Sequence, residues 1–197
     1  LHRVEAVPRR GTCVRRVRAE IRRRDGRLAA RRPDQPRHET RTLASNAGVE
    51  ELDELVQEAI SHGADVLLGG RRPAGPGAYY PPTVLAGVTR DMRAFSEELF
   101  GPVAVVHCVG SMDEAIDLAN DSPFGLSSSV FTSDPDKADR VAEELETGMV
   151  WINGTSKSSP DLPFGGVKGS GFGRELAKFG FNEFANKKLV RNPKGTK

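Results

Sequence analysis

The chain has 197 residues, 37% of them hydrophobic and 28% charged, which suits one soluble domain or part of a larger one. The charge is divided unevenly, because residues 1–42 hold 14 arginines and 5 acids, whereas the rest of the chain holds 15 basic and 22 acidic residues. No apolar run approaches the ~20 residues that a membrane-spanning helix needs, and the first residues lack the apolar core of a secretory signal. We therefore expect no membrane partner.

Cysteine and histidine are too sparse to indicate a cross-linked or metal-bound protein. Cys13 and Cys108 are the two cysteines of the sequence, which fits a reducing cytoplasm better than a disulfide framework. The four histidines have neither of the spacings typical of zinc ligands, and no cysteine pair lies near them in sequence. We expect a cytoplasmic protein without a metal site.

The Arg-rich segment 1–42 is expected to be disordered or irregular, because its few apolar residues lie among arginines and build no sustained apolar face. Three interpretations are open: a basic arm that binds nucleic acid, a solvated tail, or the product of reading a GC-rich gene out of frame. We favour the last, since Arg, Pro, Ala and Gly codons are GC-rich. The segment has no aromatic side chain for base stacking, which argues against a nucleic-acid partner.

From about Leu43 onward, helix and strand signals alternate in the manner of an α/β fold. Residues 49–63 place apolar side chains on one helical face, with a glycine positioned to end the helix. We expect a short strand at 65–68, a loop at 71–78 and an extended, partly strand-like segment at 79–88.

Three further strands are expected later in the chain. Residues 103–109 form a nearly continuous apolar run, typical of a strand buried on both faces. Strands at 126–132 and 149–153 follow, with helices at 112–120 and 135–146 between the three strands. Crossovers of this length predict right-handed βαβ units and a mainly parallel sheet with crossover helices, so the expected fold class is α/β.

Two segments break this pattern, and such breaks are where function is expected. Residues 97–103, EELFGPV, place two adjacent carboxylates before a buried strand, although a helix end with solvated acids fits the same spacing. Residues 154–176 form a long loop rich in Gly, Ser and Pro after a core strand, which is the usual position of an active site. The glycines match neither GxGxxG nor GxxxxGK[ST], so spacing alone leaves the ligand of this loop open.

Four ordered segments resemble a known family. EELFGPV, residues 119–134, residues 148–153 and residues 163–176 together resemble the C-terminal part of the NAD(P)-dependent aldehyde dehydrogenases, over about Leu43 to Arg191. The text SSPDLPFGG at residues 158–166 is most similar to the succinate-semialdehyde dehydrogenase branch. The resemblance implies that residues 43–197 are a catalytic-domain fragment with a C-terminal oligomerisation strand, and that the enzyme oxidises an aldehyde to a carboxylic acid with NAD or NADP.

The resemblance also implies roles for particular residues. Glu98 matches the carboxylate that accepts hydrogen bonds from the nicotinamide-side ribose, and Phe100 matches an aromatic packed near the nicotinamide. Phe164 matches an aromatic of the aldehyde tunnel, although simple packing also explains it. Ser158 or Ser159 falls where semialdehyde-type members bind the distal carboxylate of the substrate.

The sequence departs from the family at its reaction centre. It lacks the dinucleotide-binding domain, the general-base Glu and a nucleophilic Cys in a GQxC-like context, and Cys13 meets that context poorly. We therefore assign no catalytic residue and expect a fragment that is inactive alone. The segment 186–192 resembles the terminal strand that the family uses in subunit assembly, so a homo-oligomer is expected for the full-length enzyme. The alternatives are a non-catalytic pseudogene product or interaction module, and a nucleic-acid-binding protein with a basic arm.

Overall fold

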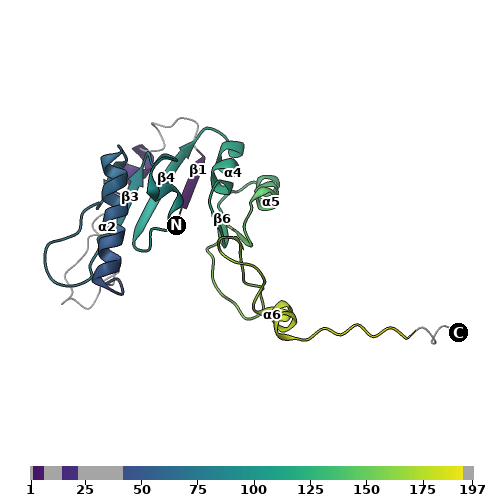
Figure 1. The fold of residues 1–197 in the computed structure, drawn as a ribbon. Coiled ribbons are helices and arrows are strands. Elements are labelled where there is room, and N and C mark those ends of the chain that lie inside the picture. The colour runs from purple at the N-terminus through teal and green to yellow at the C-terminus, as the bar shows by residue number, and fades with distance from the viewer. Residues whose placement is uncertain (1, 7–14, 22–41, 193–197) are drawn as a thin grey trace. The chain divides into compact units, whose positions relative to one another are not determined.

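The computed structural model describes residues 2–6, 15–21 and 42–192 (Figure 1). The chain divides into two compact units, Leu1–Ser122 (unit 1) and Pro123–Lys197 (unit 2), and each has its own strand pairing. Within the described ranges, no helix is long and apolar enough to cross a bilayer. The same ranges contain no group of three or more His, Cys, Asp or Glu side chains arranged to hold a metal ion.

Unit 1 is built on a four-stranded sheet with the order β1-β4-β3-β2 (Figure 1). The strands are β1 His2–Ala6, β2 Asp65–Leu68, β3 Thr83–Ala86 and β4 Val103–Val109. β1 and β3 flank β4 in parallel, whereas β2 pairs antiparallel with β3. β4 is thus an inner strand with parallel neighbours on both sides, as its apolar run predicts.

Between residues 42 and 122, the helices that accompany this sheet are α2 Asn46–Ser61, α3 Arg93–Ser96 and α4 Met112–Asn120. The predicted capping box opens α4, because Ser111 Oγ accepts a hydrogen bond from the Glu114 amide at 3.1 Å. The Glu114 carboxylate in turn accepts the amide of Gly110 at 2.7 Å. α4 lies against β1 and β4.

The hydrophobic core of unit 1 lies between α2 and the inner strands. Val49, Leu52 and Val56 of α2 are at most 2% exposed and pack in one cluster with Leu85 of β3 and Val105 of β4. The apolar face predicted for residues 49–63 is therefore the buried face of α2. The helix begins at Asn46, three residues earlier than predicted.

Within residues 1–42, where a disordered or irregular segment is expected, the structure places regular elements at residues 2–6 and 15–21. Residues 2–6 run in parallel register along β4, from His2 opposite Val105 to Ala6 opposite Val109, and residues 15–21 are helical. A strand ladder requires only main-chain donors and acceptors, so an Arg-rich composition does not prevent pairing. Residues 7–14 and 22–41 lie outside the described residues, and the out-of-frame interpretation stays a prediction.

Unit 2 contains one parallel and one antiparallel pair of strands. β6 Ser127–Val130 pairs in parallel with β7 Met149–Ile152, and α5 Pro135–Glu144 connects them, as predicted for a βαβ unit. β5 Phe124–Gly125 pairs antiparallel with β8 Val167–Lys168, and α6 Ala177–Phe184 follows. The parallel strands are therefore distributed over two sheets instead of the one expected, because β6 pairs with β7 and not with β4.

Asn153 joins the carboxyl ends of β6 and β7. Its Oδ1 accepts the amide of Thr132 at 3.0 Å, and its Nδ2 donates to the Thr132 carbonyl at 2.9 Å. The Asn153 backbone has a φ of 51°, in the left-handed region that Asn adopts more readily than most residues. These contacts support a structural role for Asn153 and fix the point where the long loop after β7 begins.

A buried hydroxyl ties the loop before β3 to the strand. Thr83 is 1% exposed, and its Oγ1 accepts the Gly70 amide at 3.0 Å while donating to the Pro81 carbonyl at 3.0 Å. Gln57 of α2 donates to the Gly70 carbonyl at 2.8 Å, so both main-chain groups of Gly70 are satisfied. The loop is thereby held to α2 and β3 together.

Thr83→Val keeps the shape of the side chain and removes its hydroxyl, leaving the Gly70 amide without its partner. We expect a loss of about 1–3 kcal/mol in the free energy of unfolding, because a buried amide is left unsatisfied. Urea unfolding measures this loss, and hydrogen exchange at the Gly70 amide locates it. An unchanged exchange rate at Gly70 would contradict the role given to the hydroxyl.

Candidate functional site

The turn from α3 to β4 presents Glu98 and Phe100 to solvent. Leu99 between them packs against the core of unit 1, and Phe100 is 78% exposed. Gly101 passes so close to α2 that an added Cβ would lie 2.3 Å from Leu52 Cδ2. Because Leu99 and Gly101 anchor this turn, the side chains on either side of Leu99 point outward.

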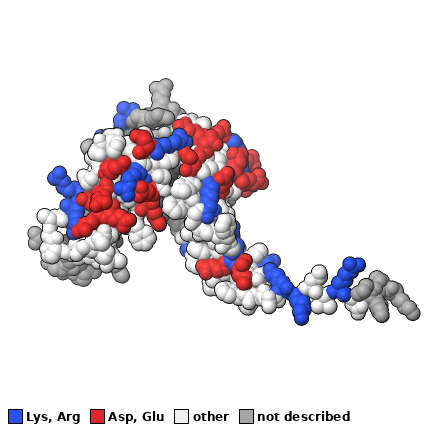
Figure 2. Space-filling view, in the orientation of Figure 1, with Lys and Arg blue, Asp and Glu red and all other residues white. Residues whose placement is uncertain are grey.

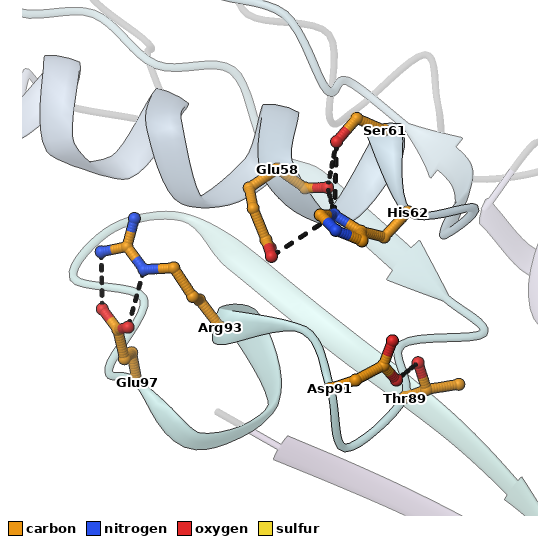
Figure 3. Close-up of polar contacts among 7 residues, drawn as sticks. All are labelled: Glu58, Ser61, His62, Thr89, Asp91, Arg93 and Glu97. Carbon is orange, nitrogen blue, oxygen red and sulfur yellow. Dashed lines mark hydrogen bonds and ion pairs between the residues drawn. The ribbon is translucent and has the colours of Figure 1, made fainter.

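The two adjacent carboxylates of the turn have different environments. Glu97 is held by Arg93, whose Nε and Nη2 donate to its two carboxylate oxygens at 2.7 and 2.9 Å (Figure 3). These hydrogen bonds lower the pKa of Glu97 and raise that of Arg93. Glu98 is exposed and has no hydrogen bond or ion pair among the residues that the structure describes.

The Glu98–Phe100 pair fits the groups that a nicotinamide nucleotide would present. An ionised carboxylate with both oxygens available accepts hydrogen bonds from two vicinal hydroxyls. An exposed aromatic ring two residues further on offers an apolar face to a flat ring. Both side chains lie on a turn anchored to the core, which favours fixed geometry.

The loop that carries Ser158 and Ser159 distinguishes the two hydroxyls. Ser159 Oγ donates to Asp161 Oδ1, and this hydrogen bond lowers the pKa of Asp161. The Ser159 carbonyl accepts the amide of Leu162 at 3.2 Å, which closes a turn. Ser158 is exposed and has no partner among the described residues, so its hydroxyl proton remains available.

Phe164 is partly buried at the start of a tightly packed backbone crossing. Its amide and carbonyl exchange hydrogen bonds of 2.9 and 2.8 Å with Glu175 across the loop. The next residue, Gly165, lies so near Gly148 that a Cβ on Gly148 would sit 2.0 Å from the Gly165 carbonyl oxygen. Arg174 Nη1 donates to the Gly166 carbonyl at 2.8 Å. The glycines of this loop thus serve close main-chain contact, which is a use that phosphate-binding templates do not describe.

The predicted site residues fall into two groups. Glu98 and Phe100 lie together on the turn of unit 1, and Ser158, Ser159 and Phe164 lie on the loop of unit 2. None of them lines the cleft of about 440 Å³ at the carboxyl ends of β6 and β7, which is bordered by Thr132, Ser133, Asp134, Pro135, Ala138, Asp139, Ile152 and Asn153.

Neither cysteine is supported as a nucleophile. Cys13 lies outside the described residues. Cys108 on β4 is disulfide-bonded, which the sparse cysteines did not lead us to expect, and a disulfide sulfur is not the thiolate that attacks a carbonyl.

Sequence reasoning missed Arg93 and Asp161, the partners of Glu97 and Ser159. The spacing Arg93 to Glu97 is i,i+4 and was a readable signal for an ion pair. The spacing Ser159 to Asp161 carries no such rule, because it depends on the turn that the loop adopts.

The fold and these segments define a class of protein. The family model described as "Aldehyde dehydrogenase family" matches residues 9–190, and the chain belongs to this family. The match includes most of the Arg-rich segment.

The relatives narrow the class. The chain is 57% identical over 159 residues to the succinate-semialdehyde dehydrogenase [NADP(+)] of Deinococcus radiodurans, covering 81% of this chain and 33% of the relative. It is 49% identical over 165 residues to the succinate semialdehyde dehydrogenase [NAD(P)+] of Escherichia coli, and the match covers 82% of this chain and 36% of that relative. The crystal structure of the Streptococcus pyogenes succinic semialdehyde dehydrogenase with NADP+ superposes with a TM-score of 0.87 at 34% identity. The superposition covers 98% of this chain and 41% of that structure's chain. The chain spans about a third of the length of the curated relatives it matches.

Gly148→Ala tests the close main-chain crossing beneath Phe164. The added methyl would overlap the Gly165 carbonyl, so we expect a loss of about 1–3 kcal/mol in the free energy of unfolding. Gly154→Ala is the matched control at the other end of β7, because its Cβ would meet atoms no nearer than 3.8 Å. Chemical denaturation of both variants makes the comparison, and equal stability of the two would contradict the crossing.

Proposed function

We propose that this chain takes part in the oxidation of an aldehyde to a carboxylic acid with NAD(P), as part of a semialdehyde-type aldehyde dehydrogenase. The observation that carries the proposal is Glu98, an exposed carboxylate without a partner among the described residues, on a turn anchored by Leu99 and Gly101. The names of the relatives, succinate-semialdehyde dehydrogenases that use NADP+ or NAD(P)+, support the substrate class and the cofactor.

In this proposal the turn of unit 1 orients the cofactor. Glu98 accepts hydrogen bonds from the ribose hydroxyls beside the nicotinamide, and Phe100 packs near the ring. A charge-assisted pair of hydrogen bonds fixes both the distance and the direction of the bound group. The bound cofactor supplies a hydride acceptor, and the chain supplies the positioning that hydride transfer needs.

The loop of unit 2 binds the aldehyde. Phe164 forms part of an apolar wall that excludes water from the reacting end. Ser158, and not Ser159, donates a hydrogen bond to the distal carboxylate of the substrate. A serine hydroxyl has a single proton to donate, and that of Ser159 is already in a hydrogen bond to Asp161. The hydrogen bond from Ser159 stabilises the Asp161 carboxylate, and the charge of Lys157 adds to this effect.

Assembly and location follow from the same proposal. Residues 43–197 form the catalytic-domain portion, and the terminal segment 186–192 pairs with another subunit in a homo-oligomer. This segment is exposed throughout, with Leu189 at 93% and Val190 at 78%, and apolar side chains so exposed are suited to burial against a second chain. We place the enzyme in the cytoplasm, where NAD(P) and small aldehydes are present.

The test compares the 197-residue chain with the protein encoded when the gene is extended upstream. We expect the extended protein to reduce NADP+ with succinate semialdehyde, and Glu98→Gln to lower kcat/KM by about 10- to 100-fold, because a misplaced cofactor reacts slowly. Absorbance of the reduced cofactor measures the rate. An extended, folded protein that turns over no aldehyde would reject the proposed function.

Ser158→Ala tests the assignment of the substrate carboxylate. We expect a rise of about 10- to 100-fold in KM for succinate semialdehyde, since a hydrogen bond to a charged group is lost. Butanal, which has no distal carboxylate, should react with unchanged KM in the same variant. Ser159→Ala is the matched control, and a larger effect from Ser159→Ala would reverse the assignment.

A further inference from the structure

Arg93 distinguishes the two adjacent carboxylates, Glu97 and Glu98, of the turn before β4. Glu97 and Glu98 lie on the same turn, and the guanidinium of Arg93 donates to both carboxylate oxygens of Glu97 (Figure 3). Glu98 has no hydrogen bond or ion pair to any residue that the structure describes. The main chain also joins the two residues, because the Glu97 amide donates to the Arg93 carbonyl at 2.8 Å. Arg93 therefore sets the direction in which Glu97 points.

Arg93 also faces acidic residues on the neighbouring helix. α2 has the sequence NAGVEELDELVQEAIS, and acidic side chains gather over this helix in Figure 2. The charges of Glu58 and Glu54 add to that of Glu97 in raising the pKa of Arg93. One oxygen of Glu58 lies 3.4 Å from His62 Nδ1, while the other is buried without a hydrogen-bond partner in the described part of the chain. The positive charge of Arg93 thus interacts with Glu97 directly and with the acids of α2 through the longer-range field.

We propose that Arg93 is a positioning residue for cofactor binding, which acts by withdrawing and neutralising Glu97 so that Glu98 alone receives the ribose. This inference rests on the proposed role of Glu98. Without the guanidinium, Glu97 adds an uncompensated negative charge beside a ligand that carries several phosphate charges, and it competes for the same hydroxyl donors. Both effects weaken binding while leaving the chemical step unchanged.

The test is a double-mutant cycle in the upstream-extended protein, with the Kd of NADP+ measured by calorimetric titration. Arg93→Gln should raise Kd by about two- to fivefold, the range expected for one charge interaction near the surface. Glu97→Gln alone should leave Kd unchanged or lower it, because it removes a negative charge and leaves the positive charge of Arg93 beside an anionic ligand. The double variant Arg93→Gln/Glu97→Gln should return Kd to the wild-type value, since the competing carboxylate is gone. Arg93→Lys keeps the positive charge but loses the planar guanidinium, so its Kd should lie between those of the wild type and Arg93→Gln.

A merely structural role for Arg93 predicts a different result, because removing Glu97 cannot restore a lost structural contact. A double variant as weak as Arg93→Gln therefore overturns the inference, as does Arg93→Gln with wild-type Kd. Arg140→Gln is the matched control, because Arg140 pairs with Glu144 at 2.6 Å with the same i,i+4 spacing on α5 of unit 2. It should leave Kd unchanged, and an equal rise there would overturn the inference.

Glu98→Gln distinguishes the positioning role of Arg93 from the ribose-binding role of Glu98. If Glu98→Gln weakens NADP+ binding and Arg93→Gln does not, the positioning role fails while the proposed function stands. If Glu98→Gln binds NADP+ as tightly as the wild type, the ribose role of Glu98 fails and the positioning role fails with it. Thermal unfolding of Arg93→Gln should match that of the wild type, because the Arg93 and Glu97 side chains are 48% and 45% exposed and such pairs add little stability.

Discussion

The packing of α2 on β3 and β4 is the interaction on which the organisation of unit 1 depends. Leu52 of α2 illustrates it, since its side chain is in the core and its Cδ2 also forms the surface over which Gly101 passes. Leu99 joins the same cluster from the turn. The outward direction of Glu98 and Phe100 is therefore set by apolar contacts made on the opposite side of the backbone.

In unit 2, the loop that carries the candidate site residues is held by other interactions than the turn of unit 1. Unit 2 buries few large side chains, and its loop is held by main-chain hydrogen bonds and glycine contacts, such as the Phe164–Glu175 exchange and the approach of Gly148 to Gly165. Asn153 closes the strand pair from which this loop starts. Rigid backbone with outward side chains is suited to substrate binding, because side chains on such a frame can differ between family members while the frame is kept.

Local signals in the sequence predicted most helices and strands of the structure. The capping box at Ser111, the apolar run at 103–109 and the apolar face at 49–63 each correspond to an observed element, because caps and periodicity act within a few residues. Strand partners were harder to predict. The parallel pairing of β1 with β4, the antiparallel β2 and the division into separate sheets depend on contacts between distant segments, which local patterns do not encode.

The same limit applied to the candidate site. The residues came from resemblance, and the structure adds which of two equivalent neighbours is engaged, Glu97 rather than Glu98 and Ser159 rather than Ser158. Such choices depend on rotamers and turns, and a run of identical residue types gives no preference between them.

Strand β1 has a consequence for the order of events during synthesis. Its partner β4 lies about 100 residues later in the chain, so at ~5–20 residues per second the strand waits about 5–20 s on the ribosome before its neighbour exists. An unpaired strand is prone to aggregate, and charged residues are the usual protection. With 14 arginines in residues 1–42, this part of the chain is suited to staying dispersed until β4 has been made.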